Sequence, residues 1–194
     1  MKTSLLYYLS ILLMPLFSGC HGNHHTQAIE KNYSSETIYR ASCSELKSDH
    51  IPDSVWKMTN LRELSIMGMD CDTGSDSCWA VSVLPPEIGN LTNLETLRLN
   101  VNAISNLPAE MSKLTKLKEL VLDDNLSLQN IEAICQLPNL EHLSLFGCGL
   151  RKLPVIIRLL TRLKTIGLTG NPLTEKDIEV LHRALPDCKI IFEQ

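Results

Sequence analysis

The chain has 194 residues, of which 44% are hydrophobic, 21% are charged and only 5% are aromatic, and this length fits one domain or at most two small ones. The 18 basic and 22 acidic residues give a net charge of -4, which argues against nucleic acid or another phosphate-rich partner as the main target. The low aromatic content argues against a platform on which bases or sugars stack. Leucine supplies about one residue in six, and this excess indicates a repeated structural role.

Residues 1–19 are interpreted as a secretory signal. Lys2 gives a short positive start, and residues 5–17 form an almost unbroken apolar run that small residues follow, which is the order of regions in a signal peptide. The run is shorter than the about 20 apolar residues that a membrane-spanning helix needs. The sequence therefore predicts a cleaved leader rather than a transmembrane helix.

The end of this segment is more specific than a generic signal. Ser18 and Gly19 precede Cys20, and this sequence resembles the bacterial lipobox, although Phe17 stands where that family usually has Leu. The resemblance implies that Cys20 is lipidated and that its acyl chains anchor the protein to a membrane of the bacterial cell envelope. His21, in place of Asp, favours the outer membrane, at its surface or its periplasmic face. An ordinary signal peptide cleaved nearby is the alternative.

Residues 20–34 form a polar stretch without clear periodicity, so we expect a flexible linker between the anchor and the rest of the chain. The stretch contains His21, His24 and His25. Metal capture is one interpretation of this cluster, and a solvated tether is the other. We favour the tether because no cysteine or carboxylate completes a defined ligand set, and we predict neither a metal nor a cofactor.

Beyond residue 35 the same apolar positions recur at a fixed spacing. Four successive copies hold Leu91, Leu94, Leu97 and Leu99; Leu114, Leu117, Leu120 and Leu122; Leu137, Leu140, Leu143 and Leu145; and Leu160, Leu163, Ile166 and Leu168. Each copy starts 23 residues after the one before, and Asn102, Asn125, Cys148 and Asn171 keep the same step. Segments such as ETLRL and KELVL alternate apolar and polar residues, which is typical of a strand with one buried face.

This pattern resembles the leucine-rich repeat family in its 23-residue form, LxxLxxLxLxxN with a following LPxxI. The resemblance implies an α/β fold class: a leucine-rich repeat solenoid, a curved horseshoe with a parallel β-sheet on its concave face and short helices, 3-10 turns and loops on its convex face. We expect about six repeats and a C-terminal helix–strand cap within residues 35–194. The expected units are 35–57 (an N-terminal cap repeat), 58–90, 91–113, 114–136, 137–159 and 160–194 (the last repeat and its cap). In this family the Asn of a repeat bonds backbone groups of the neighbouring turn, which would otherwise be buried without partners.

The first two units are irregular. Repeat 58–90 carries a ten-residue insertion, because 33 residues separate Met58 from Leu91. In unit 35–57, a 23-residue step places Ile38, Ala41 and Cys43 at the apolar positions and Arg40 beside Glu63. Such atypical terminal repeats are expected because they lack a neighbour on one side.

The later units also show local departures. Repeat 114–136 lacks the Leu-Pro pair, and we expect Leu128, Ile131 and Ile134 to fill its convex side after a one-residue shift. In the last unit, Thr174 and Asp177 have the spacing of a capping box, which predicts a helix over 174–185 that covers the end of the core. Pro186 ends this helix, and residues 189–192 are expected to form a closing strand.

The insertion, DCDTGSDSCWAVSV, is rich in small and polar residues. We predict a local disulfide between Cys71 and Cys78 that pins this loop. Its acidic residues, Asp70, Asp72 and Asp76, suggest a calcium loop. However, Gly74 stands where an EF-hand loop has its third acidic ligand and the distal Glu is missing, so a solvated loop that contacts a partner is favoured. Trp79 is either an exposed interface anchor or packs against the solenoid. The other cysteines, Cys43, Cys135, Cys148 and Cys188, are interpreted as small buried apolar residues.

Stacking would place equivalent strand positions side by side, about 5 Å apart, in three outward-facing columns. The columns are Arg40, Glu63, Thr96, Glu119, His142 and Thr165; Ser42, Ser65, Arg98, Val121, Ser144 and Gly167; and Ser44, Met67, Asn100, Asp123, Phe146 and Thr169. Ser144, His142 and Asp123 share this surface, so a hydrolase triad has to be considered. Side chains on an open sheet point outward in parallel, and no nucleophile elbow or oxyanion hole is indicated, so no catalytic residue is predicted. Glu119 and His142 are expected to form a surface ion pair.

The concave face is instead predicted to be a recognition surface. Its candidate binding residues are Met67, Arg98, Asn100, Val121, Asp123, His142 and Phe146. Phe146 is the expected anchor, and sideways packing on His142 or on Met67-like neighbours is the alternative. The resemblance implies a non-enzymatic module that binds a protein, or a glycan, of a host or of the envelope. We also expect a monomer, and the charge balance argues against nucleic acid. A scaffolding role in the envelope without an external ligand is the alternative.

Overall fold

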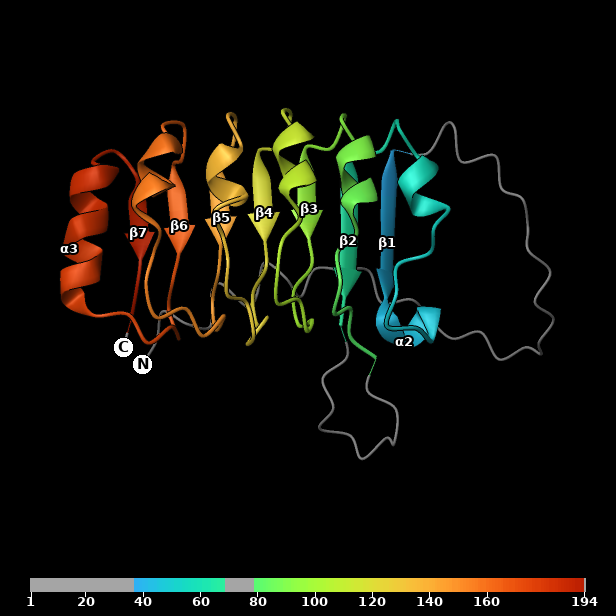
Figure 1. Ribbon diagram of the computed structural model, residues 1–194, viewed down its shortest axis with the longest axis horizontal. Coiled ribbons are helices and arrows are strands. Elements are labelled where there is room, and N and C mark those ends of the chain that lie inside the picture. The colour runs from blue at the N-terminus through green and yellow to red at the C-terminus, as the bar shows by residue number, and fades with distance from the viewer. Residues whose placement is uncertain (1–36, 69–78, 194) are drawn as a thin grey trace. The chain divides into compact units, whose positions relative to one another are not determined.

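The structure is a computed structural model, and it describes residues 37–68 and 79–193. Seven parallel strands form one sheet in the order of the chain (Figure 1). They are β1 (Ile38–Ser42), β2 (Glu63–Met67), β3 (Thr96–Arg98), β4 (Glu119–Val121), β5 (His142–Ser144), β6 (Thr165–Gly167) and β7 (Lys189–Ile191). Because neighbouring strands are parallel, each connection returns along the other face of the sheet. The expected repeat solenoid is confirmed.

The register of the sheet follows the repeat. Thr96 pairs with Glu119, Glu119 with His142, and His142 with Thr165, so equivalent positions 23 residues apart lie side by side. The apolar residues that alternate with these positions point to the opposite face and form the core, with Leu64, Leu97, Leu120 and Ile166 fully buried and Leu143 3% exposed. The sheet therefore presents one polar face to the outside.

Short 3-10 helices carry the chain back across the other face of the sheet, and Figure 1 shows them in front of the strands. They are η2 (Val55–Lys57), η4 (Pro86–Asn90), η5 (Ala109–Lys113), η6 (Ile134–Gln136) and η7 (Val155–Leu159). Pro85, Pro108 and Pro154 lead into η4, η5 and η7 with extended backbones. The shorter η6 has no such proline, and Leu128, Ile131 and Ile134 are buried there, which confirms how repeat 114–136 fills its convex side.

A ladder of buried asparagines links the repeats. Asn125 donates its amide to the carbonyl oxygens of Leu99 and Leu122 at 2.9 and 2.7 Å, and its Oδ1 accepts the backbone N–H of Ile104 at 3.0 Å. Asn102 and Asn171 make equivalent bonds. The ladder satisfies backbone groups inside the core, as the family resemblance implies.

The four cysteines of the described residues are free and buried: Cys43, Cys135, Cys148 and Cys188. Their interpretation as buried apolar residues is confirmed. Cys148 takes the ladder position of an asparagine, and its Sγ donates to the carbonyl oxygen of Leu122 at 3.2 Å. Burial raises the pKa of the Cys148 thiol to about 12, so this thiol stays protonated at neutral pH. The predicted Cys71–Cys78 disulfide lies outside the described residues, as does the lipidation site at Cys20.

The first strand differs from its predicted register. Arg40 pairs with Ser65 and Ile38 with Glu63, so the expected placement of Arg40 opposite Glu63 is wrong by two residues. Ile38 is 46% exposed and does not enter the core, while Tyr39 takes the inward position opposite Leu64. A shift of two residues keeps the same side chains on each face of a strand, and the apolar pattern alone therefore did not distinguish the two registers.

The chain after the insertion resumes at a defined point of the repeat. Val81 donates its backbone N–H to Asn102 Oδ1 at 2.8 Å, and its carbonyl oxygen accepts from Ala103 at 2.9 Å. Val81 lies 21 residues before Asn102, just as Ile104 lies 21 residues before Asn125. The ten inserted residues of this repeat therefore precede Val81 in the sequence. Trp79 is half-buried and packs against the core, which favours its packing role over that of an exposed anchor.

The C-terminal end of the core is covered as the spacing predicts. Helix α3 (Glu175–Ala184) begins with a capping box between Thr174 and Asp177. Leu181 and Leu185 are buried, and Ile178 packs against the core. Strand β7 then closes the sheet beside β6. Within residues 37–68 and 79–193, no helix has the length and apolar character needed to cross a membrane.

Candidate binding surface

An ion-pair network crosses the first four strands on the exposed face of the sheet. It consists of Arg40, Glu63, Arg98 and Glu119. Glu63 accepts two hydrogen bonds from Arg40 at 2.7 and 2.9 Å, and one from Arg98 at 2.9 Å. Arg98 also reaches Glu119 Oε1 at 2.8 and 3.0 Å. Two guanidinium groups and two carboxylates therefore neutralise one another across β1 to β4.

The network holds the Glu63 carboxylate in the charged form. The hydrogen bond from Arg40 lowers the pKa of Glu63, and the charges of Arg40 and Arg98 act in the same direction, against the opposing effect of burial. Arg98 was predicted as a binding residue, but its guanidinium lies between two carboxylates of its own chain. Arg98 therefore orders the sheet face more than it offers a free charge to a ligand.

A second polar cluster lies between β4 and β5. Asp123 Oδ1 accepts the Ser144 hydroxyl at 2.6 Å and the backbone N–H of Phe146 at 2.9 Å. Burial raises the pKa of the Asp123 carboxyl, although both hydrogen bonds act to lower it. The predicted residues Asp123 and Phe146 are thus brought together, but the contact uses the backbone of Phe146 and leaves its ring to pack elsewhere.

The residues of the considered triad do not form a catalytic arrangement. His142 Nδ1 lies 2.7 Å from Thr165 Oγ1 on β6, whereas Ser144 donates to Asp123. A triad needs the histidine between the serine and the carboxylate. The expected ion pair of Glu119 with His142 is also wrong, because Glu119 turns toward Arg98 and completes the network.

The ring of Phe146 packs sideways onto the next strand. A β-carbon added to Gly167 would lie 2.5 Å from Cε2 of Phe146, so the ring covers the bare backbone of β6. Phe146 is half-buried rather than fully exposed, and Gly167 is one neighbour of its ring. One side of the ring is therefore fixed by the fold.

The sequence-predicted residues divide into two groups on this face. Met67, Arg98 and Asn100 lie on or after β2 and β3, with Met67 paired to Ser42 of β1. The other group is a strip over β4 to β6, formed by Val121, His142, Ser144, Phe146 and Thr165 together with the half-buried carboxylate of Asp123, which accepts the Ser144 hydroxyl and the Phe146 N–H. Val121, Phe146 and Thr165 are half-buried, and His142 is exposed.

Sequence analysis did not include the partners that fix these residues among the candidate binding residues, although it placed Arg40 beside Glu63. Arg40, Glu63 and Glu119 complete the ion-pair network, and Thr165 orients His142. The available signal for Glu63 and Glu119 was that each stands one repeat away from the oppositely charged Arg98, in the neighbouring column. Arg40 gave a weaker signal because its register was not fixed. Among the described residues, no group of three His, Cys, Asp or Glu side chains could hold a metal ion.

The geometry defines a leucine-rich repeat solenoid whose sheet face carries an ion-pair network over β1 to β4 and a strip of hydrogen-bonding and apolar side chains over β4 to β6. The chain belongs to the leucine-rich repeat family: the family model for a leucine-rich repeat region matches residues 39–185. Members of this family typically mediate protein interactions and are typically not enzymes. A comparison with curated proteins finds no match.

Solved structures share the fold. A leucine-rich repeat protein of Leptospira interrogans is 31% identical, with a TM-score of 0.65, over 74% of this chain and 34% of that one. An internalin from Listeria monocytogenes is 18% identical, with a TM-score of 0.57, over 75% of this chain and 40% of that one. The leucine-rich repeat domain of the type III effector XopL is 26% identical, with a TM-score of 0.52, over 70% of this chain and 43% of that one. The chain thus spans about a third to two fifths of these structures.

Proposed function

We propose that this protein is a non-enzymatic binding module that recognises a protein partner through the sheet face of its solenoid, and that acyl chains on Cys20 hold it at the bacterial cell envelope. The observation that carries the binding proposal is the strip over β4 to β6, with its partly exposed apolar and hydrogen-bonding side chains, beside a self-neutralised ion-pair network. Membership of a family that typically mediates protein interactions supports the same role. Solenoid proteins commonly use such extended faces for recognition.

The strip has the features of a protein-binding site. His142 is exposed, and Val121 and Phe146 are half-buried, so a partner surface can cover them. The carboxylate of Asp123 among them already accepts two hydrogen bonds from its own chain, as a polar group covered by a partner needs. The packing of Phe146 on Gly167 fixes the ring before a partner arrives, which reduces the entropy lost on binding. The ion-pair network on β1 to β4 would form the polar rim of this site.

Site-specific crosslinking tests the location of the site. A photo-crosslinking amino acid at His142 should capture the partner, and the captured protein is then identified by mass spectrometry. The same amino acid at Val155, which is 78% exposed on η7, serves as the control on the opposite face. Capture from Val155 but not from His142 would contradict the proposed use of the sheet face.

The affinity of the identified partner then tests the anchor. Phe146→Ala should weaken binding by about 2 kcal/mol, which is typical of a buried aromatic hot spot. The matched control is Leu126→Ala, because Leu126 is 75% exposed and outside the strip. Urea unfolding of both variants separates a lost contact from a lost fold. An unchanged affinity of a folded Phe146→Ala variant would exclude Phe146 as the anchor.

The membrane anchor is a separate proposal with its own test. Cells grown with a labelled fatty acid should incorporate label into the wild-type protein and lose it in Cys20→Ala. Label that persists in Cys20→Ala, or that is absent from the wild type, would leave an ordinary cleaved signal as the better explanation. The result does not depend on whether the sheet face binds a partner.

Orientation separates recognition of an external partner from a scaffolding role inside the envelope. Protease added to intact cells should remove the repeat domain if it faces outward from the outer membrane. Complete resistance in intact cells, with digestion after the cells are opened, would favour the periplasmic scaffold. The sheet-face crosslinking experiment then shows whether an envelope component is the partner.

A further inference from the structure

The edge of the sheet at which the strands begin is strongly basic, although the whole chain is acidic. This edge comprises five segments, 57–62, 90–95, 113–118, 136–141 and 158–164, each between a 3-10 helix and the next strand (Figure 1). They contain eight basic residues and only two acidic ones, Glu95 and Glu141. All eight basic side chains are exposed. We call this set of five segments the basic edge.

The basic residues gather in alternate repeats. Lys57 and Arg62 belong to the first group, Lys113, Lys116 and Lys118 to the second, and Arg158, Arg162 and Lys164 to the third. The two intervening repeats place exposed Asn90 and Gln136 at this edge, together with its two acidic residues, Glu95 and Glu141. Neighbouring strands lie about 5 Å apart, so successive basic groups are spaced by about 10 Å along one line.

Hydrogen bonds hold two of these basic side chains in the same way. Lys116 Nζ donates to Asn93 Oδ1 at 2.7 Å, and the Asn93 amide donates to the Thr59 carbonyl oxygen at 2.9 Å. Two repeats further on, Arg162 donates to Asn139 Oδ1 at 2.6 Å, and the Asn139 amide donates to the Thr115 carbonyl oxygen at 2.6 Å. The same relay thus recurs after 46 residues.

An ion pair recurs with the same period. Lys118 bonds Glu95 at 2.8 Å, and Lys164 bonds Glu141 at 2.6 Å. Glu95 also lies 3.6 Å from Arg62 of the first group. The other five basic residues of the edge, Lys57, Lys113, Lys116, Arg158 and Arg162, have no carboxylate partner among the ion pairs of the described residues. The edge therefore carries a regular row of positive charge whose side chains are already ordered.

We propose that the basic edge is a second binding site, distinct from the sheet face, which takes a linear acidic polysaccharide bearing regularly spaced sulfate or carboxylate groups. The row of basic groups matches a polymer whose charges recur along its length, and ordered Lys and Arg side chains bind such groups through charge-assisted hydrogen bonds. The exposed amides of Asn90 and Gln136 lie between the charges, where sugar hydroxyls need hydrogen-bond partners.

Two other polyanions fit the edge less well. A single-stranded nucleic acid is typically held by aromatic side chains on which its bases stack, and the five segments contain no aromatic residue. An anionic lipid surface attracts basic residues without regard to their spacing, so it gives no reason for the 46-residue period or for the relays that order Lys116 and Arg162. The polysaccharide accounts for the charge, the period and the intervening amides together.

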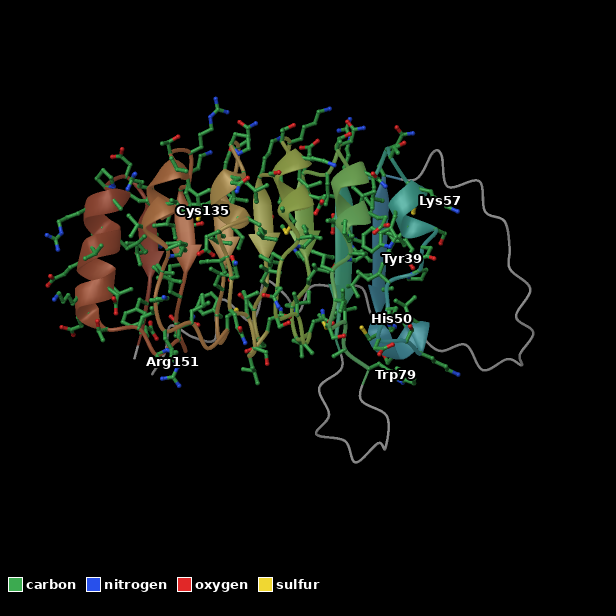
Figure 2. All side chains as sticks on the ribbon, in the orientation of Figure 1. Tyr39, His50, Lys57, Trp79, Cys135 and Arg151 are labelled. Atoms are coloured by element: carbon green, nitrogen blue, oxygen red, sulfur yellow. The ribbon has the colours of Figure 1, made fainter. Side chains whose placement is uncertain are left out.

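The test uses heparin, a sulfated polysaccharide, as the probe and the full-length protein. Binding at physiological salt should weaken by about tenfold or more in Lys116→Gln/Arg162→Gln and should weaken for the wild type as salt is raised, because the attraction is screened. The matched control is Arg151→Gln/Lys152→Gln, which removes the same charge from two exposed residues outside the basic edge; Figure 2 shows Arg151 at the opposite edge from Lys57. This control should stay within about twofold of the wild type.

Fragments of heparin add a test of the spacing. Affinity should rise steeply once a fragment is long enough to reach two basic groups, about 10 Å apart. Equal weakening by the edge variant and its control, or tight binding by the edge variant, would overturn the proposal. Binding to phosphatidylglycerol vesicles in the absence of any heparin binding would overturn it in favour of a lipid surface. Loss of the sheet-face partner in these variants is not expected, so the two sites can fail independently.

Discussion

The phenyl ring of Phe146 occupies the space that a side chain on Gly167 would need. A β-carbon on Gly167 would lie 2.5 Å from Cε2 and 3.0 Å from Cζ of this ring. The backbone of Gly167 is not left-handed, so its conformation does not require glycine. Only the space that the ring occupies excludes a larger side chain at this position. The candidate anchor and the small residue beneath it thus form one unit across β5 and β6.

This relationship predicts the effect of a single methyl group. Gly167→Ala should destabilise the fold by about 1–3 kcal/mol, the usual cost of overpacking, or displace the ring from its site. Urea unfolding measures the first outcome, and the ring proton shifts of Phe146 measure the second. In Gly167→Ala/Phe146→Ala the cost should be less than the sum of the two single changes. Additive costs, or an alanine at 167 without any effect, would show that the ring does not depend on this space.

The sequence predicted the fold well because the repeat fixes many positions at once. Leucines at 23-residue steps predicted the strands and the core, and asparagines at the same step predicted the ladder. Agreement between successive copies strengthened each of these predictions. The register of β1 was not fixed, because a shift of two residues leaves Tyr39, Ala41 and Cys43 on the same face. Only the cross-strand pairing of Arg40 with Ser65 resolves this ambiguity.

The candidate site was less predictable because it depends on side-chain partners. The columns correctly placed Arg98 and His142 on the sheet face. They did not predict that Arg98 would bond Glu63 or that His142 would turn to Thr165. The net charge of -4 likewise hid a basic edge, since a sum over the chain contains no information about position. Both features become visible only when the repeats are laid side by side.

Backbone strain at Val101 gives a second prediction. Val101 has φ 57°, and the equivalent positions in the next three repeats are Asp124 at 57°, Gly147 at 60° and Gly170 at 76°. A β-branched residue is strained in this region, by roughly 1–2 kcal/mol. Val101→Gly should raise the free energy of unfolding by about 1 kcal/mol after the greater entropy of an unfolded glycine is included.

Asparagine offers a control for this change. Val101→Asn should also stabilise the protein, because Asn tolerates left-handed backbone, while Val101→Ala should gain much less. Denaturant unfolding of the three variants gives the comparison. A loss of stability in both Val101→Gly and Val101→Asn would mean that contacts of the valine side chain outweigh its strain.

The gap in the asparagine ladder gives a third prediction. Cys148 bonds the Leu122 carbonyl oxygen through a weak S–H donor, whereas Asn125 and Asn171 each make donor and acceptor bonds. Cys148→Asn should therefore stabilise the fold by about 1 kcal/mol, and Cys148→Ala should destabilise it by a similar amount. Thermal unfolding tests both. A less stable Cys148→Asn would show that this repeat is too tight for the amide.

The half-buried carboxylate of Asp123 predicts a dependence on pH. Burial raises its pKa in the folded state, so the folded protein holds this proton to a higher pH than the unfolded chain. The contribution of Asp123 to the free energy of unfolding therefore falls as the pH rises from about 3.9, the ordinary pKa of Asp, through the raised pKa of the folded state. Above that raised pKa, the buried charge remains unfavourable. Asp123→Asn should be more stable than the wild type at pH 7, with the difference shrinking at low pH.

Asp177 provides a control of opposite sign. Its hydrogen bond from the Thr174 side chain lowers its pKa, so Asp177→Asn should destabilise the protein at pH 7 and lose this effect as pH falls through the lowered pKa of Asp177. Urea unfolding of both variants between pH 3 and pH 7 measures the two trends. A less stable Asp123→Asn at pH 7 would mean that the charged oxygen gains more from Ser144 and the Phe146 N–H than it loses by burial. A carbon NMR titration of the Asp123 carboxyl in Ser144→Ala should then separate these contributions, because loss of the hydroxyl should raise the pKa further.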